Sequence, residues 1–554
     1  MNIRHEINMS PRKYFTKIVF PSLILSTLVA VVIYFLLDRN SSSFKFVAFF
    51  IPIIGIIYSV AYPTLKTDRR KNEIDSKAHF FITAFGVLSK SDVNRKSILK
   101  MISEKKELGY LATEIYKLYV LVDRWNQSIS KSARFLSKRT SSRTFSDFLD
   151  RFAHSQDSGE DMDKFLYKEQ ETVMNGYSTY YKGALYEIDL FKEIYSAILL
   201  SLVFLMAFVI IIPMLMGGNL VRMIIYISIF FMVVEIALIY FVKSVTPYDP
   251  IWHSRDIVTR TDRKLLFSFI ISIAGCVFVA LIIHITQNTE FTRKIPFQFL
   301  ISFAISPLLY SGFISRREEN VVKRKDDNFS SFLRTLGSSA SARGGLILEP
   351  LYYLTTHDFG PLTGDIKNLY RRLSLRINGV KSWNFFSAET GSYLIDIFSK
   401  LFVESISLGG EAGDVSDIIS SNFNRILTLR KQKFQVTSSF IGIVYGITAG
   451  VVFSMAISFT IAQVINSLYL GLNVNAGALS GILYTTSPSN LQIVSFIIFL
   501  IFIIHSLLSA VLIRVIDGGH YLNTLIHFVF LVWTSAIVMF ISEKVVTSLI
   551  STKI

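Results

Sequence analysis

Cysteine is almost absent from this chain of 554 residues. The one cysteine, Cys276, lies inside an apolar run, so the chain has neither an internal disulfide framework nor a cysteine-based metal site. Histidines are few and scattered, and those in polar segments lack a second ligand at metal-binding spacing. The sequence therefore predicts no metal and no cofactor.

Catalytic signatures are missing as well. The sequence has no Gly-x-x-x-x-Gly-Lys-Ser/Thr phosphate loop, no His-Glu-x-x-His zinc motif and no Gly-x-Ser-x-Gly nucleophile motif. These absences predict a protein that is not an enzyme. If its work is driven by ATP, another subunit must supply the nucleotide site.

Acidic residues are in the minority, and the formal net charge is +16. The basic residues fall mostly in segments that border apolar runs. Anionic lipid headgroups and acidic protein partners account for such a distribution. Nucleic acid is therefore not an expected partner, whereas the lipid bilayer is.

Apolar residues are plentiful, at 51% of the chain, which predicts an all-α polytopic membrane protein. The first apolar run is longer than a signal-peptide core and no small-x-small cleavage site follows it, so we expect it to remain as an anchor. Nine runs approach the ~20 residues that cross ~30 Å of hydrocarbon. The predicted spans are 18–37, 46–62, 196–216, 221–242, 265–285, 297–314, 440–465, 491–513 and 522–541.

The charges of the short loops predict the orientation of these spans in the cell membrane. The N-terminal tail and the loop 243–264 are basic, which places them on the cytoplasmic side, whereas the linker 466–490 carries no charge and suits the outside. Four spans separate the two long polar segments, so both segments are expected in the cytoplasm. The predicted domains are 1–63, 64–195, 196–314, 315–439 and 440–554.

The polar segments 64–195 and 315–439 are predicted to be small helical bundles of five or six helices each. Apolar residues recur in them at helical spacing, as in the stripe of Phe145, Phe148 and Phe152, and strand-like alternation is absent. Thr144 followed by Asp147 predicts a capping box at the start of that helix.

The two polar segments also repeat one another. Ser-Gly-Glu-Asp at 158–161 is echoed by Gly-Gly-Glu-Ala at 409–412, and Gly86 and Gly109 recur 251 residues later as Gly337 and Gly360. A repeat this long indicates a duplicated domain, because solenoid repeats recur every ~20–50 residues. The register slips by about one residue near Trp125. In the constant register the second copy has alanine where the first has an aspartate.

Charged residues in both modules are candidate partner contacts. Basic clusters beside membrane spans serve topology and headgroup contact, or they bind an acidic surface on a motor protein. The acids beside the repeated glycines fit helix starts, where they favour the positive end of the dipole, and are also candidate contacts. The candidate residues are Arg69, Arg70, Lys71, Glu160, Asp161, Lys323, Arg324, Lys325 and Glu411.

Small residues form a stripe in the predicted span 440–465. Gly442, Gly446 and Gly450 recur every fourth residue, and Ser454 and Ser458 follow in phase. Small residues on one helix face let backbones approach closely, so this stripe predicts a packing seam, either within the chain or across a dimer.

Glu235 lies near the middle of the predicted span 221–242. A charged acid at mid-bilayer costs ~2.5–3.5 kcal/mol on insertion scales, so it should face protein or be protonated. It is either a proton or signalling site or a neutral carboxyl bonded to a neighbouring helix.

Together these features resemble the type II secretion F domain family. The arrangement with extra spans is similar to its archaeal branch, the membrane platforms of archaella and archaeal type IV pili (the FlaJ and TadC relatives). The residues that carry the resemblance are Ser-Pro-Arg-Lys-Tyr-Phe at 10–15, Arg-Thr-Ser-Ser at 139–142, Phe-Leu-Asp-Arg at 148–151, the Ser-Gly-Glu-Asp string with Glu169 and Gln170, and Tyr-Asp-Pro-Ile-Trp at 248–252.

The resemblance implies a non-enzymatic platform that works as a homodimer. Such platforms couple a hexameric secretion ATPase to the insertion of pilin or archaellin subunits, beside other basal components. Two alternatives stay open: a secondary transporter with large cytoplasmic domains, which would place polar groups such as Glu235 at mid-membrane, and an intramembrane enzyme. The sequence leaves open whether the filament is an archaellum or an adhesion pilus.

Overall fold

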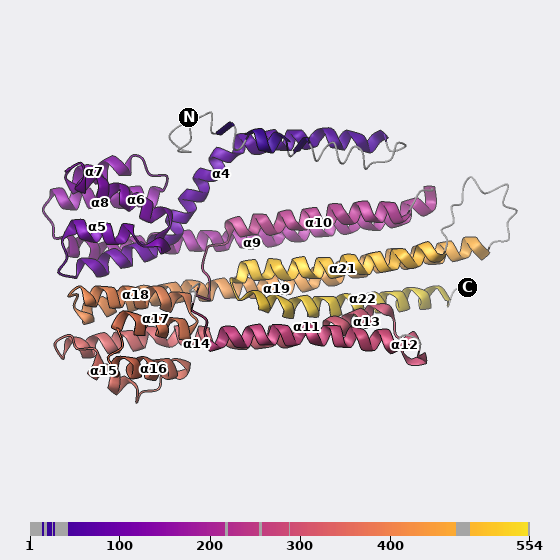
Figure 1. The fold of residues 1–554 in the computed structure, drawn as a ribbon. Coiled ribbons are helices and arrows are strands. Elements are labelled where there is room, and N and C mark those ends of the chain that lie inside the picture. The colour runs from indigo at the N-terminus through magenta and orange to yellow at the C-terminus, as the bar shows by residue number, and fades with distance from the viewer. Residues whose placement is uncertain are drawn as a thin grey trace. The chain divides into compact units, whose positions relative to one another are not determined.

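The computed structural model describes residues 14–15, 19–24, 26–27, 42–216, 220–253, 257–286, 289–471 and 488–551. These residues form helices joined by short turns, and the described part contains no strand beyond one isolated bridge between Trp252 and Ser392 (Figure 1). The predicted all-α class is therefore confirmed. The chain divides into two compact units, Met1–Tyr177 and Ser178–Ile554.

The first unit is a helical bundle that closes around a phenylalanine core. Phe81 of α4 meets Phe148 of α8 edge to face, with ring centroids 5.2 Å apart, and Phe152 packs against Phe85 at 5.6 Å. The predicted stripe of α8 is thus buried, because residues three and four apart share one helix face. The helices are α4 (Ser42–Ser89), α5 (Arg95–Ser103), η2 (Lys106–Leu108), α6 (Tyr110–Asp123), α7 (Ile129–Ser137), α8 (Arg143–Asp157) and the start of α9 (Met162–Met216).

The start of α8 differs from the predicted capping box. The N-cap is Ser142, whose hydroxyl accepts a hydrogen bond from the amide of Phe145 at 3.1 Å, so the prediction of a start at Thr144 is wrong. The same hydroxyl donates to the buried carboxylate of Asp75 on α4. Burial raises the pKa of Asp75, and the bond from Ser142 opposes that rise. Ser142 is therefore held as the N-cap by a hydrogen bond to Asp75, a residue distant in sequence.

The second unit contains a membrane bundle that continues into another helical module. Two helices, α14 and α19, pack along one another and belong to both parts. The helices are α10 (Leu220–Val245), α11 (Arg260–Thr286), α12 (Glu290–Lys294), α13 (Phe297–Ile305), α14 (Leu308–Ser341), α15 (Leu348–Leu354), η3 (Gly360–Leu362), α16 (Thr363–Ser374), α17 (Gly379–Thr390), α18 (Tyr393–Ser407), α19 (Ala412–Gly471), α21 (Pro488–Asp517), η4 (Tyr521–Asn523) and α22 (Thr524–Ser551).

Six of the described helices are long and apolar enough to cross a membrane: Met162–Pro213, Leu220–Val245, Arg260–Thr286, Ala412–Ser467, Leu491–Asp517 and Tyr521–Leu549. The predicted span 297–314 is broken, because α13 and α14 meet at an angle of 43°. Pro307 lies at this break, and its ring has no N–H to continue a helix. If that pair counts as one span, the described part has up to seven.

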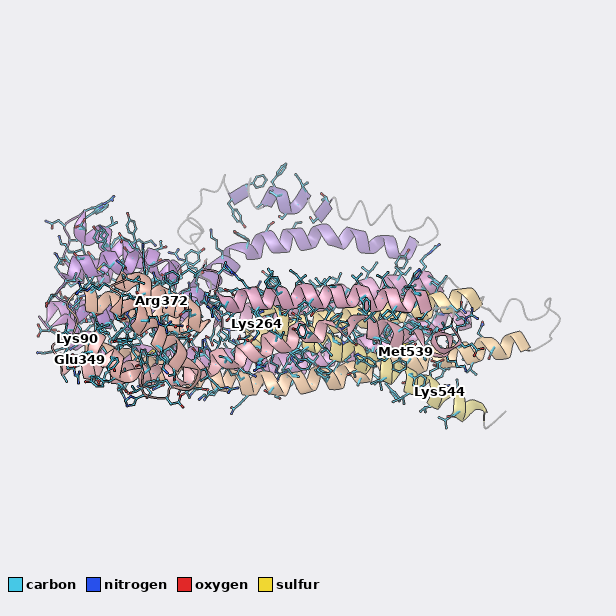
Figure 2. The ribbon with its side chains drawn as sticks, turned by 60° about the horizontal axis from the view of Figure 1, so that its bottom comes forward. Lys90, Lys264, Glu349, Arg372, Met539 and Lys544 are labelled. Atoms are coloured by element: carbon cyan, nitrogen blue, oxygen red, sulfur yellow. The ribbon has the colours of Figure 1, made fainter. Side chains whose placement is uncertain are left out.

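The first two predicted spans are not tested by these helices. Span 18–37 lies largely outside the described residues, and span 46–62 falls in α4, where most side chains are outside the described part. The count of nine therefore stays a prediction. In the second unit, Lys264 at the start of α11 and Lys544 near the end of α22 lie at opposite ends of the membrane helices (Figure 2).

Two helices run without a break from a polar segment into a membrane span. The helix α9 has 55 residues and α19 has 60. At 1.5 Å per residue these lengths are about 80 Å and about 90 Å, far more than a bilayer requires. Within the second unit, α19 thus joins a module and a membrane span in a single helix.

Turns in the two polar segments match in conformation. Gly109 and Gly360 have φ of 56° and 58°, whereas Gly159 and Gly409 have φ of 73° and 87°. The first pair is 251 residues apart and the second 250, so the one-residue slip lies between them. Asp161 therefore corresponds to Glu411, not to the alanine that the constant register indicated. The duplication itself stays a prediction, which these turns support.

Candidate functional site

The predicted contact residues of the first unit are mostly engaged in local ion pairs. Arg70 donates to Glu114, which also accepts from Lys117 at 3.1 Å. Lys71 is exposed, and the side chain of Arg69 lies outside the described part. In the turn before α9, Glu160 pairs with Lys168 at 2.9 Å and Asp161 pairs with Lys164 at 3.2 Å. The two acids and their lysine partners form a small surface of mixed charge.

In the second unit, three consecutive basic residues of α14 have different environments. Lys325 is buried, with its ammonium 2.7 Å from Asp365 and donating to the carbonyl of Glu389 at 3.0 Å. Lys323 lies 3.9 Å above the ring of Phe434. Arg324 is exposed. Of this cluster, Arg324 is therefore the residue best placed to meet a partner.

Glu411 is the last of the predicted contact residues. It is exposed in the turn before α19 and accepts a hydrogen bond from Ser341 at 3.3 Å. Its place in that turn matches the place of Asp161 in the first unit.

A buried charge cluster, which we define as Arg430, Asp249 and Asp326, was not predicted. The guanidinium of Arg430 on α19 donates to both carboxylate oxygens of Asp249, one of them at 3.0 Å, and to Asp326 on α14 at 2.9 Å. Tyr181 of α9 donates to Asp249 at 3.2 Å, and Ser392 donates to Asp326. Because the guanidinium donates two hydrogen bonds to one carboxylate, it fixes the relative orientation of the two side chains more strictly than a lysine ammonium would.

The charge cluster holds the loop that follows α10 against the second module. In this loop, Ile251 accepts from the amide of Tyr393 at 3.0 Å, and His253 donates to the carbonyl of Gly391 at 3.1 Å. Gly391 has φ of 76°, a conformation that favours glycine, and Trp252 packs beside it. Membrane helices α9 and α10 are thus joined to α14, α18 and α19 through one loop.

The pKa of Asp249 reflects its pairing with Arg430. Burial alone would raise it, but the Arg430 guanidinium outweighs burial and lowers the pKa of Asp249 to about 2. A carboxyl with a lowered folded pKa contributes stability above its unfolded pKa near 4, and that stability is lost as the pH falls toward 2.

Glu235 is buried inside the membrane bundle, as predicted for an intramembrane acid. Its carboxylate shares a hydrogen bond with Nδ1 of His505 on α21, and the other ring nitrogen lies 3.0 Å from the Thr448 hydroxyl on α19. Sequence reasoning missed His505, because the two partners are 270 residues apart. Glu235 and His505 thus link α10, α21 and α19 within the second unit.

We expect His505→Leu to destabilise the bundle by about 1–3 kcal/mol, because it leaves the buried Glu235 carboxyl without that hydrogen bond. Thermal unfolding of the detergent-solubilised chain measures the effect. The double variant Glu235→Leu/His505→Leu should recover most of the loss, since both polar groups are then gone. Equal stabilities of the single variant and the natural chain would contradict this structural role.

The small-residue stripe of α19 faces away from the core of the second unit. Among the described residues, no atom lies within 4 Å of where a Cβ would stand on Gly442, Gly446 or Gly450, whereas Val444 and Thr448 on the opposite face are buried. Ser454 is half-buried, and Ser458 is buried. In the described part of this unit, nothing packs against the three glycines.

The sequence also matches known proteins. A family model described as type II secretion system protein F matches residues 81–211. Flagella accessory protein J of Methanococcus voltae is 40% identical over 559 residues, which cover 100% of this chain and 99% of that protein. Flagella accessory protein J of Methanocaldococcus jannaschii is 40% identical over 553 residues, which cover 99% and 98%. No solved structure matches. With both relatives aligned from end to end, this multi-pass membrane chain belongs to the flagella accessory protein J family.

Proposed function

We propose that this chain is the membrane platform of an archaellum or a related archaeal type IV pilus-like filament machine. It couples a cytoplasmic secretion ATPase to the insertion of pilin-like subunits and is itself not an enzyme. The observation that carries the proposal is the continuity of α9 and α19, each of which extends unbroken from a polar segment into a membrane span. Within the second unit, α19 offers a continuous helix along which a displacement is transmitted without a hinge.

The buried charge cluster supports the same function. Arg430 ties the loop after α10 to the second module, so a force applied to that module reaches several membrane helices together. A loop held only by exposed ion pairs would detach under such a force, because each exposed pair contributes only ~0–1 kcal/mol. The family relationship supports a role in filament assembly, since the relatives are called flagella accessory proteins.

The proposed orientation places the N-terminus and both polar segments in the cytoplasm, where the ATPase works. The chain acts as a homodimer, for which the outward glycines of α19 offer a close-packing face. The remaining basal components and the filament subunits meet the platform from the other side of the bilayer or within it.

Co-purification with the hexameric secretion ATPase of the same organism tests this function. We expect the ATPase to co-purify with the natural chain and Arg324→Glu to reduce its recovery several-fold, because the exposed cation becomes an anion facing an acidic partner. Arg293→Glu is the matched control, an exposed arginine on α12 that the proposed orientation places outside. A natural chain that recovers no ATPase, as a transporter would, contradicts the proposal.

A further inference from the structure

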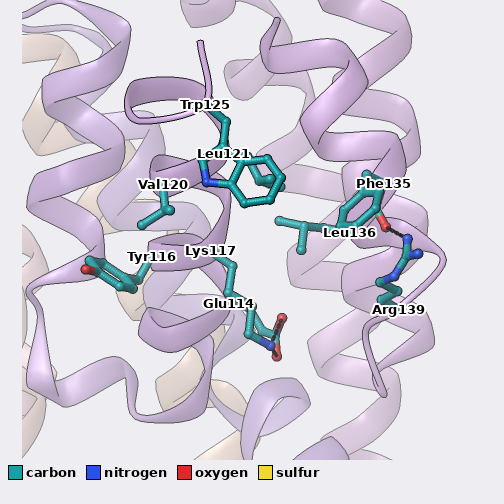
Figure 3. A pocket seen from close by; sticks show the side chains of 9 residues that line it. All are labelled: Glu114, Tyr116, Lys117, Val120, Leu121, Trp125, Phe135, Leu136 and Arg139. Atoms are coloured by element: carbon teal, nitrogen blue, oxygen red, sulfur yellow. Dashed lines mark hydrogen bonds and ion pairs between the residues drawn. The ribbon is translucent and has the colours of Figure 1, made fainter. Parts of the chain in front are cut away.

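A groove opens on the surface of the first unit between α6 and α7. Its volume is about 340 Å³, and apolar side chains from both helices line it, among them Tyr116, Leu121, Phe135 and Leu136 (Figure 3). Trp125, in the turn between the helices, lies at its mouth. A concave apolar surface of this size accommodates one or two inserted side chains.

The aromatic residues at the groove are not needed for the core of the unit. Trp125 is 68% exposed and Phe135 is 44% exposed, whereas Leu118 and Ala133 on the inner faces of the same helices are buried. Exposed aromatics gathered around a hollow mark a binding surface rather than a packing surface.

Two basic residues, Lys117 and Arg139, line the groove, and the chain that follows α6 is rich in basic residues. The stretch 124–143 contains six basic residues and no acidic residue, namely Arg124, Lys131, Arg134, Lys138, Arg139 and Arg143. Arg139 lies 3.7 Å above the ring of Phe135, so a charge stands directly beside the apolar wall. Arg134 is paired with Asp157, and the one acid of the lining, Glu114, is occupied by Arg70 and Lys117. The basic residues of the lining and of the stretch 124–143 therefore favour a ligand with negative charge.

We propose that the groove between α6 and α7 binds an acidic protein segment that inserts an apolar side chain between Trp125 and Phe135. The hollow requires a protruding chain, which a polypeptide offers and a flat bilayer surface does not. Arg139 in the lining and the basic stretch 124–143 favour a segment with carboxylates on either side of the anchor. This inference does not depend on the partner being an ATPase, so it stands or falls separately from the proposed function.

The second unit provides a natural comparison. Phe385 on α17 is 43% exposed and lies under the guanidinium of Arg372, with 5.3 Å between charge and ring. There, however, Arg372 is paired with Glu389, so its charge is compensated within the chain. Phe385 matches Phe135 in residue type and exposure, and it serves as the control position.

The test uses the full chain in nanodiscs of neutral lipid and a fluorescent helical peptide with two leucines on one face and glutamates elsewhere. Two matched peptides carry lysine for glutamate or serine for leucine. Fluorescence anisotropy should show saturable binding of the acidic leucine peptide alone. We expect Phe135→Ala to weaken this binding about tenfold, as for a central anchor, and Phe385→Ala to change it less than twofold.

Several results would overturn the inference. Equal binding of the serine peptide would mean that charge alone acts, and equal losses for the two phenylalanine variants would mean that the groove is not the site. Absence of saturable binding has the same consequence. A competition assay adds vesicles of anionic phosphatidylglycerol to the bound peptide. If the vesicles displace the peptide from the natural chain but not from Phe135→Ala, the groove binds the membrane instead. Circular dichroism confirms that both variants fold.

Discussion

Arg430→Met is expected to destabilise the chain by about 3–5 kcal/mol, one of the largest effects of any single substitution proposed for it. The side chain of Arg430 is only 3% exposed, and both of its carboxylate partners are buried. Methionine fills much of the space but leaves Asp249 and Asp326 in a low dielectric without their shared cation. The penalty arises from these two uncompensated charges more than from the lost attraction.

The adjacent lysine provides the matched control for Arg430. Lys431 is 66% exposed and pairs with Asp327 at 3.0 Å, so Lys431→Met should cost at most about 1 kcal/mol. Thermal unfolding and the yield of monodisperse protein in detergent compare the two variants. Similar midpoints for both would show that burial of the cluster has no energetic consequence.

Gly337→Leu is expected to cost about 3 kcal/mol, at the upper end of overpacking effects. Gly337 lies on α14 where α19 crosses it, and a Cβ there would stand 2.5 Å from the carbonyl oxygen of Ala412 and closer still to Ser416. Since a backbone atom cannot rotate away, the two long helices must separate. The expected readout is a large fall in the unfolding midpoint.

Gly446→Leu is the matched control, with the same change of residue in α19. Nothing lies within 4 Å of that position, so the stability of the single chain should be unchanged or slightly higher. The same variant tests the predicted seam, because leucine there would block close packing of a second copy. Dimer recovery that is normal in Gly446→Leu would show that no such seam exists.

The sequence allows the helical class, six of the described spans and the cores of the polar segments to be predicted, because each rests on local periodicity or run length. The buried charge cluster was not predictable in this way. Arg430 looks like one more cation ahead of a membrane span, and only the fold brings it to Asp249, 181 residues earlier. The cap at Ser142 was missed for a similar reason, since the carboxylate of Asp75 comes from another helix.

The surroundings of small residues were likewise not predictable from the sequence. Gly337 and Gly446 are both glycines inside helices, and periodicity drew attention to the second. The structure gives them opposite surroundings: the first is a tight crossing and the second is open. Spacing identifies which residues share a face, but it does not say what that face meets.

Because α19 is a single unbroken helix, the angle about its axis between Arg430 and the glycine stripe is fixed. Each residue turns an α-helix by about 100°, so inserting one residue between 430 and 442 would rotate the stripe by that amount about the axis. Conversely, whatever turns the end of α19 that carries Arg430 also redirects its glycines. The direction in which the glycines could meet a second copy is therefore set by the two carboxylates that bind Arg430.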